Sequence, residues 1–227
     1  MKAIVYTNYG QPDELHLKEV ETPIPGDSEI LVKVMASTVN RTDCANLTAK
    51  PFIMRFGLGL LKPKNTIPGT EFAGDIEAVG KAVTSFMVGD KVFGFDDSVL
   101  SSYAEYLTIS EDKGLAVIPD DYSYEQAAAS SEGTHYAYNF INKVDMKPGQ
   151  KVLVNGASGG IGSAAVQLLK YHGAEITAVC NTKNLELVKS LGAKMVIDYL
   201  MEDFTKDKQR YDYVFDTVGK SSFGKCK

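Results

Sequence analysis

The sequence predicts an α/β protein with a β-rich first half: an antiparallel β-domain followed by a domain in which strands and helices alternate around a parallel sheet. Up to about residue 120, short β-branched and aromatic runs are separated by Gly, Pro and Asp, which is typical of an antiparallel barrel or sandwich. After residue 150 each strand-like run is followed by a helical one, which indicates right-handed crossovers and a parallel sheet. The 227 residues suffice for two modest domains.

The expected strands of the first domain are short runs over residues 3–10, 30–39, 69–80, 89–95 and 102–110. The first helix signal comes at Ser123, which is followed three residues later by Gln126 in a capping-box pattern before an alanine-rich stretch. We therefore place the domain boundary between residues 122 and 123. The predicted domains are 1–122 and 123–227.

In the second domain we expect strands over 151–156, 175–180, 194–199 and 211–219 and helices over 162–173 and 184–193. Apolar residues at helical spacing, such as Ile161, Ala165 and Leu168, form the buried face of the first helix, and Gly173 ends it. The four strands match the first four of a doubly wound dinucleotide-binding fold, whose full strand order is 3-2-1-4-5-6. We expect an incomplete form of that fold, with its last strand on an open edge.

Composition and charge argue against several classes of protein. The formal net charge is −5 and basic residues occur singly or in short pairs, which argues against a nucleic-acid surface. No apolar run approaches the ~18 residues needed to span a bilayer, and the N-terminus lacks the pattern of a secretory signal. The three cysteines, Cys44, Cys180 and Cys226, are far apart, which predicts neither a disulfide framework nor a structural zinc site and suits a reducing cytoplasm.

A glycine-rich turn with the sequence Ala-Ser-Gly-Gly-Ile-Gly lies where the first strand of the second domain passes into its helix. We expect Gly159 to permit a tight turn, Gly160 to let a ligand approach the backbone, and Gly162 to let the helix pack closely. The free N–H groups from Ser158 through Ile161 to Gly162 would then bind a pyrophosphate at the positive end of the helix dipole. An alternative interpretation is a plain connector, because such turns also occur without ligands.

The end of the second strand of this domain indicates which dinucleotide binds. NAD-specific sites usually carry Asp or Glu there to bond the ribose 2′-hydroxyl. This chain has Cys180 and Asn181 at that point. Thr182 and Lys183 follow, and with Asn181 they can hydrogen-bond and neutralise a 2′-phosphate, so we expect NADPH as the cofactor. A simpler interpretation, compatible with the first, is a solvated loop that caps the next helix.

Seven segments, taken together and in order, resemble a known family. They are MKAIVY, ILVKVMASTVNRTD, IPGTEFAGDIEAVG, VGDKVFGF, AAASSEG, VLVNGASGGIGSAAVQLLK and LGAKMVIDY. The chain resembles the zinc-free, quinone-oxidoreductase-like branch of the medium-chain dehydrogenase/reductase superfamily. The resemblance implies a GroES-like β-barrel domain, then a Rossmann domain, and NADPH as the cofactor. Relatives continue with two further strands, so the resemblance also implies a C-terminally truncated chain.

The resemblance also bears on zinc. Zinc-dependent relatives have cysteine at the position of Asn40, histidine at Thr70 and cysteine at Glu132, and none of these ligands is present here. We therefore expect no catalytic metal. Without a Lewis acid, hydride transfer should go to an already electron-poor acceptor, such as a quinone or an α,β-unsaturated carbonyl. The expected partner is thus a small-molecule substrate.

Further site residues are implied by the same resemblance. It places Asn40 beside the nicotinamide, followed by Arg41 as a cofactor contact and Thr42 as a catalytic residue. It places His135 near the nicotinamide too, where the imidazole would donate a proton. Three more cofactor contacts are implied at Tyr199, Thr217 and Val218. The alternative interpretations are that Asn40 bonds its own backbone in a turn, that His135 is a core or interdomain histidine, and that Tyr199 only packs.

Two functional hypotheses follow. The first is a zinc-independent, NADPH-dependent oxidoreductase of the cytoplasm, and the second is a truncated NADPH-binding or structural fragment without turnover. We expect a homo-oligomer, either a dimer or a pairing through the exposed sheet edge. Residues 50–65 mix apolar and basic side chains, and they are predicted either to line a hydrophobic substrate entrance or to pack on their own domain.

Overall fold

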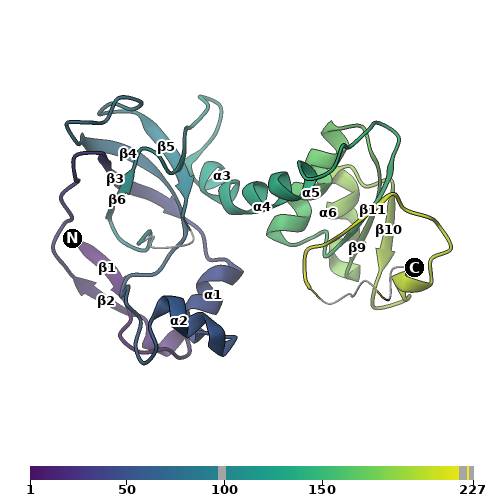
Figure 1. Cartoon of the computed structure of the whole chain (residues 1–227), viewed down its shortest axis with the longest axis horizontal. Coiled ribbons are helices and arrows are strands. Elements are labelled where there is room, and N and C mark those ends of the chain that lie inside the picture. Colours follow the sequence, from purple (N-terminus) through teal and green to yellow (C-terminus); the bar gives the residue numbers. More distant parts are fainter. Residues whose placement is uncertain (97–100, 220–223, 225–227) are drawn as a thin grey trace. The chain divides into compact units, whose positions relative to one another are not determined.

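The computed structural model describes residues 1–96, 101–219 and 224. The chain divides into two compact units, Met1–Ser131 and Glu132–Lys227, and each contains its own sheet (Figure 1). The domain boundary expected between residues 122 and 123 stays a prediction. Cys226 lies outside the described residues.

The first unit is built on a five-stranded antiparallel sheet with the order β6-β3-β4-β5-β7. Its strands are β3 (Glu29–Ser37), β4 (Glu71–Val79), β5 (Lys91–Phe95), β6 (Tyr106–Ser110) and β7 (Gly114–Val117), and a separate two-stranded sheet joins β1 (Lys2–Val5) to β2 (His16–Glu19). Ile30 and Val32 of β3 are fully buried, because a strand turns alternate side chains to the same face. They pack with Phe72, Ile76 and Val92 into the core of this sheet.

The five strands expected in this unit are confirmed, and the structure adds two more. The sequence does not predict β2, because all four of its residues are exposed and form no apolar pattern. It does not predict β7 either, since that strand is only four residues long and contains one half-buried side chain. Pairing with β5, which is not visible in the local sequence, makes β7 a strand.

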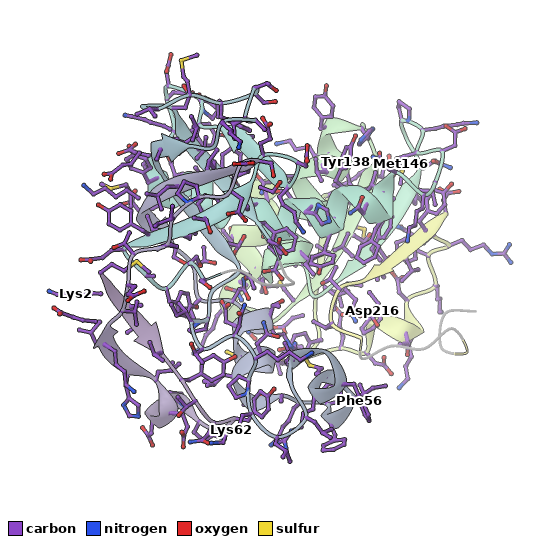
Figure 2. All side chains as sticks on the ribbon, turned by 60° about the vertical axis from the view of Figure 1, so that its left-hand side comes forward. Lys2, Phe56, Lys62, Tyr138, Met146 and Asp216 are labelled. Carbon is purple, nitrogen blue, oxygen red and sulfur yellow. The ribbon has the colours of Figure 1, made fainter. Side chains whose placement is uncertain are left out.

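The helices of the first unit are α1 (Arg41–Thr48), α2 (Arg55–Leu58) and α3 (Tyr124–Ala129), with 3₁₀ turns at Pro12–Glu14 and Phe52–Met54. The capping box expected at Ser123 is confirmed, because the Ser123 and Gln126 side chains each accept a hydrogen bond from the other's backbone. The residues directly after Asn40 form the first turn of α1. Figure 2 shows Phe56 of α2 and Lys62 at one edge of the unit.

The second unit contains a four-stranded parallel sheet in the order β10-β9-β8-β11. Its strands are β8 (Lys151–Asn155), β9 (Glu175–Cys180), β10 (Met195–Asp198) and β11 (Tyr213–Asp216). In chain order this is 3-2-1-4, so the doubly wound arrangement expected from the sequence is confirmed.

Helices pack on this sheet. They are α4 (Ser131–Ile141), which begins at the last residue of the first unit, α5 (Gly160–Tyr171) and α6 (Leu185–Leu191), with 3₁₀ turns at Thr182–Asn184 and Phe204–Lys206. The expected face of α5 is buried, since Ala165 and Leu169 pack with Val154 and Ile176 of the sheet. Gly173, with a φ of +76°, follows the helix as expected. None of the described helices has the length and apolarity needed to cross a membrane.

Candidate functional site

The glycine-rich turn joins the carboxyl end of β8, an inner strand of the sheet, to the beginning of α5. Its left-handed residue is Gly156, whose φ is +81°. Gly159 has a φ of −79°, which any residue adopts, so the prediction for Gly159 is wrong and the tight turn lies earlier. The N–H groups of Gly156 and Ala157 both donate to the Val179 carbonyl of β9 at 3.0 Å, which ties the turn to the neighbouring strand.

The other glycines of the turn have different surroundings. A Cβ on Gly162 would lie 2.1 Å from the Gly156 carbonyl oxygen, which confirms the close packing expected there. A Cβ on Gly160 would meet no atom within 4 Å, so the backbone at this position is open. A Cβ on Gly133 of α4 would lie 2.7 Å from the Gly160 carbonyl oxygen, so α4 also approaches the turn closely. Ser158 is half-buried in the same turn.

The first turn of α5 presents backbone N–H groups that have no intrahelical acceptor. These belong to Gly160, Ile161 and Gly162, because the hydrogen bond that begins the helix runs from Ser163. That bond reaches the Gly159 carbonyl at 2.8 Å. In the described part of the chain no side chain caps this helix, and its first turn contains no acid. The arrangement therefore suits an anion such as a pyrophosphate.

The residues that follow β11 lie against the same turn. Thr217 donates from its backbone N–H and from its hydroxyl to the Asn155 carbonyl, at 3.1 and 2.8 Å. A Cβ on Gly156 would lie 2.8 Å from both Thr217 Oγ1 and Val218 Cγ1. Because β11 pairs in parallel with β8, the carboxyl ends of the two strands meet. The structure therefore brings Thr217 and Val218 to the glycine-rich turn.

The carboxyl end of β9 carries the residues expected to select the cofactor. Cys180 is buried, and burial raises the pKa of its thiol above the ordinary value. The side-chain oxygen of Asn181 is buried and has no hydrogen-bond partner among the described residues. Lys183 is exposed on the 3₁₀ turn that follows, and Tyr199 is exposed directly after β10.

A residue that the sequence did not single out lies beside them. Asp198, the last residue of β10, is buried and is in register with Cys180. Its carboxylate accepts hydrogen bonds from the Thr182 hydroxyl at 2.5 Å and from the Leu200 backbone at 3.0 Å. The signal that predicts its place is an acid at the end of the third expected strand, because parallel strands of such a fold end at the same edge.

In the first unit, Asn40 begins α1 as its N-cap. Its Oδ1 accepts from the backbone N–H groups of Thr42 and Asp43, and the Asp43 carboxylate accepts from the Asn40 backbone. The alternative interpretation, that Asn40 bonds local backbone, is therefore confirmed for this oxygen. Its amide nitrogen donates to Thr70 Oγ1 at 2.8 Å and to Glu71 Oε2 at 3.2 Å.

Two buried carboxylates belong to this polar cluster. Glu71 accepts from the hydroxyl groups of Thr38 and Ser131, the latter at 2.9 Å. Asp43 accepts from the Tyr103 hydroxyl at 2.9 Å. Burial raises the pKa of the Asp43 carboxyl, although its hydrogen bonds act in the opposite direction. Burial, and next the charge of Asp43, also raise the pKa of the Tyr103 hydroxyl.

The side chains of Asn40 and Thr70 do not offer ligand atoms that suit zinc. By the resemblance, Asn40 and Thr70 stand where zinc-dependent relatives have cysteine and histidine, and here the two side chains hydrogen-bond to each other. An amide nitrogen and a hydroxyl are not ligands that zinc prefers. Over residues 1–96 and 101–219, no group of three or more His, Cys, Asp or Glu side chains is placed to hold a metal ion.

His135, the third expected catalytic residue, is exposed on α4, so the alternative of a core histidine is wrong. Its Nε2 lies 3.0 Å from Asn139 Nδ2, one helical turn further on. Its ring meets that of Tyr136 edge-on, with the centroids 5.5 Å apart. Arg41 is exposed in the first turn of α1. The expected site residues are thus divided between the two units.

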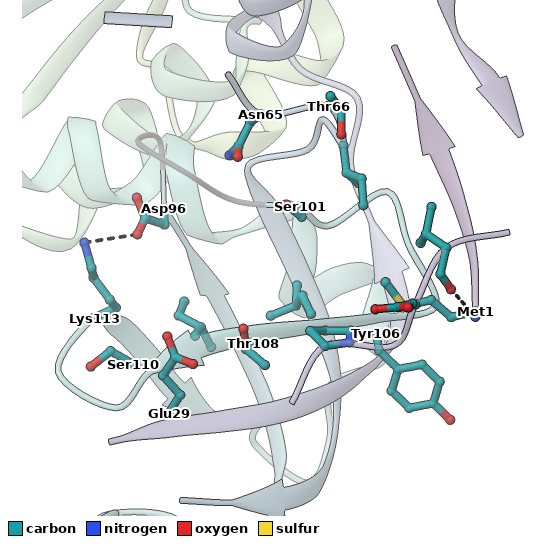
Figure 3. Close-up of a pocket in the computed structure, with 16 residues that line it drawn as sticks. Met1, Glu29, Asn65, Thr66, Asp96, Ser101, Tyr106, Thr108, Ser110 and Lys113 are labelled. Carbon is teal, nitrogen blue, oxygen red and sulfur yellow. Dashed lines mark hydrogen bonds and ion pairs between the residues drawn. The ribbon is translucent and has the colours of Figure 1, made fainter. Parts of the chain in front are cut away.

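A cavity of about 590 Å³ lies along β6 in the first unit (Figure 3). Figure 3 shows the Lys113–Asp96 ion pair, at 3.1 Å, on one side of it and Met1 on the other. The amino group of Met1 donates to the Val20 carbonyl at 2.8 Å. None of the expected site residues lines this cavity, so we assign it no part in the candidate site.

Comparison with known proteins gives matches over both units. Residues 26–120 match the family model described as alcohol dehydrogenase GroES-like domain, and residues 160–226 match the model described as zinc-binding dehydrogenase. The NADPH-dependent alkenal/one oxidoreductase, chloroplastic, of Arabidopsis thaliana is 33% identical over 96% of this chain and 58% of its own length. The quinone-oxidoreductase homolog, chloroplastic, of Spinacia oleracea is 35% identical over 94% of this chain and 67% of its own length.

A solved structure is similar as well. The quinone oxidoreductase from Coxiella burnetii matches with a TM-score of 0.88 and 30% identity, over 96% of this chain and 69% of that one. The chain therefore spans between 58% and 69% of the length of these three proteins.

Proposed function

Because the chain belongs to the quinone-oxidoreductase-like branch of the medium-chain dehydrogenase/reductase superfamily, we propose that it binds NADPH and reduces a quinone or an α,β-unsaturated carbonyl. Its first unit is GroES-like and its second is Rossmann-like. The names of the Arabidopsis and spinach relatives support both the cofactor and the two classes of acceptor.

The observation that carries the proposal is the open glycine-rich turn at the beginning of α5. The N–H groups of Gly160, Ile161 and Gly162 have no intrahelical acceptor, and Gly160 leaves room for a ligand against the backbone. These features fit the pyrophosphate of a dinucleotide. The residues proposed to hold it are Ser158, Gly159, Gly160, Ile161, Gly162, Thr217 and Val218.

We propose that the carboxyl end of β9 holds the adenosine ribose and its 2′-phosphate. The unpartnered oxygen of Asn181 is buried, so the side chain would have to turn outward to accept a hydrogen bond from a ribose hydroxyl. The exposed ring of Tyr199 belongs to the same end of the sheet, because the Tyr199 N–H donates to the Cys180 carbonyl at 3.1 Å. The hydrogen of the Thr182 hydroxyl is already donated to Asp198, whose charge opposes a phosphate. The preference for NADPH over NADH therefore depends mainly on the positive charge of Lys183.

Bound NADPH supplies the hydride, and the residues of the chain orient the substrate and move the proton. We propose Asn40, Thr42 and His135 as catalytic residues and Arg41 as a cofactor contact. The Asn40 amide is held in one orientation by four hydrogen bonds within the protein, so a substrate or cofactor that contacts it would have to replace one of these partners. The Asn139 side chain contacts His135 Nε2, so Nδ1 is the ring nitrogen through which the protonated imidazole would pass its proton.

We propose that the reaction is zinc-independent. This rests on the hydrogen-bonded pair of Asn40 and Thr70, because neither side chain offers an atom that zinc prefers. Without a Lewis acid to polarise a carbonyl, the acceptor itself must be electron-poor. That requirement favours a quinone or an enone over a simple ketone.

Isothermal titration of the chain with NADPH and with NADH tests the cofactor, and we expect tighter binding of NADPH. The loss of NADPH absorbance in the presence of a panel of quinones and enones tests the reaction. Tight NADPH binding without oxidation by any acceptor would favour the second hypothesis, a cofactor-binding chain without turnover. Failure to bind either dinucleotide would refute the proposal.

We also propose a cytoplasmic location and a homodimer. The free thiols of Cys44 and Cys180 suit a reducing compartment, and β11 ends the described sheet with an edge to which a second copy can pair. Imaging of the tagged protein tests the location, and a plastid signal is the contrary outcome that the chloroplastic relatives suggest. Sedimentation velocity tests the dimer.

A further inference from the structure

Residues 50–65, which we call the apolar–basic loop, lie in an acid-free part of the chain. No acidic residue occurs between Asp43 and Glu71. The same stretch contains four basic residues, Lys50, Arg55, Lys62 and Lys64. Because the formal net charge of the whole chain is −5, this stretch has the opposite sign to the remainder.

Hydrogen bonds hold the second half of this loop in one shape. The Lys64 N–H donates to the Leu58 carbonyl at 2.8 Å, which closes the intervening residues into a turn. The Tyr9 hydroxyl donates to the Gly59 carbonyl at 2.7 Å and ties the turn to the N-terminal part of the unit. Gly59 has a φ of +125°, and a Cβ there would lie 2.1 Å from the Lys62 carbonyl oxygen. The backbone of the turn is therefore tight and specific to glycine.

The apolar side chains of the loop are exposed to solvent. Their exposed fractions are 63% for Phe52, 72% for Ile53, 70% for Phe56, 54% for Leu60 and 85% for Leu61. The rings of Phe52 and Phe56 meet edge-on with their centroids 6.3 Å apart, so the two form one apolar surface. The expectation that this loop packs on its own domain is wrong for these side chains. Clustered exposed apolar groups mark a binding surface.

Positive charge flanks this surface. Three lysines of the loop are exposed and have no ion pair among the described residues: Lys50, Lys62 and Lys64. The Arg55 guanidinium lies over the rings of Tyr9 and Phe52, at 4.9 and 5.5 Å from their centroids. Figure 2 shows Phe56 and Lys62 at the same edge of the first unit. Apolar and positive groups thus occur together.

We propose that the apolar–basic loop binds the surface of an anionic phospholipid bilayer. Exposed Phe, Ile and Leu side chains enter the headgroup region, while the lysines pair with lipid phosphates. The remainder of the chain is net negative and is repelled by such a surface, so the loop is the part that faces it. A second copy of the chain is a poorer occupant, because a two-fold contact would bring the four cations of each copy together.

Co-sedimentation of the full chain with vesicles tests this proposal, and it does not depend on the proposed reaction. Phosphatidylcholine vesicles containing about 30% phosphatidylglycerol are compared with vesicles of phosphatidylcholine alone, and we expect binding to the former that weakens with salt. Joint replacement Lys62→Glu and Lys64→Glu should weaken binding at least ~25-fold, since each cation contributes about fivefold. Leu61→Ser should weaken it roughly tenfold through lost apolar burial.

Matched controls separate the loop from general effects. Lys18→Glu with Lys208→Glu makes the same change in net charge at exposed lysines elsewhere, and Ile24→Ser removes a side chain that is 89% exposed. Both controls should bind vesicles as the unchanged chain does, and NADPH titration should be the same for all variants. The proposal is overturned if the loop variants bind equally well, or if the unchanged chain ignores anionic vesicles. A dimer that Leu61→Ser abolishes, without vesicle binding, would overturn it in favour of a second copy.

Discussion

The Thr182 hydroxyl donates its hydrogen to the Asp198 carboxylate at 2.5 Å, which joins the loop after β9 to the end of β10. This bond holds a buried negative charge beside the residues that we propose bind the 2′-phosphate. A carboxylate and a phosphate repel each other, so Asp198 should work against the preference for NADPH that we propose for Lys183.

Asp198→Asn should therefore strengthen NADPH binding about fivefold and leave NADH binding nearly unchanged, because one opposing charge is worth ~1 kcal/mol at this kind of site. Fluorescence titration with both cofactors measures the effect. Glu202→Gln, at an exposed acid four residues further along the chain, is the control. An equal change for both cofactors would show that Asp198 does not face the 2′-phosphate.

Lys183→Glu should weaken NADPH binding by at least tenfold and NADH binding by much less, since only NADPH carries the additional phosphate. Lys208→Glu, at another exposed lysine of the second unit, should affect neither cofactor. Fluorescence titration of each variant with NADPH and NADH measures both effects. Equal losses for NADPH and NADH after Lys183→Glu would refute the assignment of the 2′-phosphate to this loop.

Two glycine substitutions separate folding from cofactor binding. Gly162→Ala forces a Cβ to within 2.1 Å of the Gly156 carbonyl oxygen, so it should lower the free energy of unfolding by about 1–3 kcal/mol. The Cβ that Gly160→Ala introduces would meet no atom within 4 Å, so the free energy of unfolding should be unchanged or slightly raised. The substitution should still weaken NADPH binding about tenfold, because the methyl group occupies the ligand's approach. Thermal unfolding and NADPH titration of both variants check this, and Gly160→Ala binding as tightly as the unchanged chain would contradict it.

The stability of the first unit should depend on pH through Asp43. Burial raises the pKa of this carboxyl, so the folded chain holds its proton more tightly than the unfolded chain does. That contribution is complete below the unfolded pKa and is lost as the pH rises through the folded pKa. The amide introduced by Asp43→Asn has no such proton. The free energy of unfolding of the unchanged chain, minus that of Asp43→Asn, should therefore fall from about pH 4 to pH 7.

Urea unfolding followed by circular dichroism at several pH values measures this difference. A difference that stays constant with pH, or that grows as the pH rises, would show that the Asp43 pKa is not raised. Asp13→Asn, at an exposed acid of the same unit, is the control and should show no comparable trend.

Metal analysis of the purified chain should find no stoichiometric zinc, because Asn40 and Thr70 occupy positions that need a thiolate and an imidazole. Treatment with a chelator should leave NADPH oxidation unchanged. One tightly held zinc ion per chain, or activity that zinc restores, would overturn the zinc-independent reaction.

Much of the second unit follows from its sequence, because the patterns there are local. Apolar strand runs and the amphipathic α5 predict every element of its sheet, and the crossover rule predicts their order. The sequence predicts the edge of the sheet at which Asp198 lies, but not that Asp198 is in register with Cys180. Its place beside Cys180 comes from the pairing of two strands that a helix separates in the chain.

The elements of the first unit and the position of the glycine-rich turn are harder to predict from the sequence, because they depend more on tertiary contacts. Only Asp43 and Leu47 of α1 are buried, so this helix lacks an apolar stripe, although the spacing of Asn40 and Asp43 is itself a capping signal. The position of the tight turn is not decided by the glycine-rich motif either. Gly156 precedes that motif, and its conformation goes with the hydrogen bond to Val179 of the next strand.

The close approach of Gly133 to the carbonyl of Gly160 has an evolutionary consequence. Any side chain at residue 133 pushes α4 away from the turn, since its first carbon would lie 2.7 Å from that oxygen. A side chain at residue 133 is then tolerated only where the backbone at residue 160 takes another path. We therefore expect glycine to be retained at 133 among homologues wherever the backbone at 160 keeps its present path.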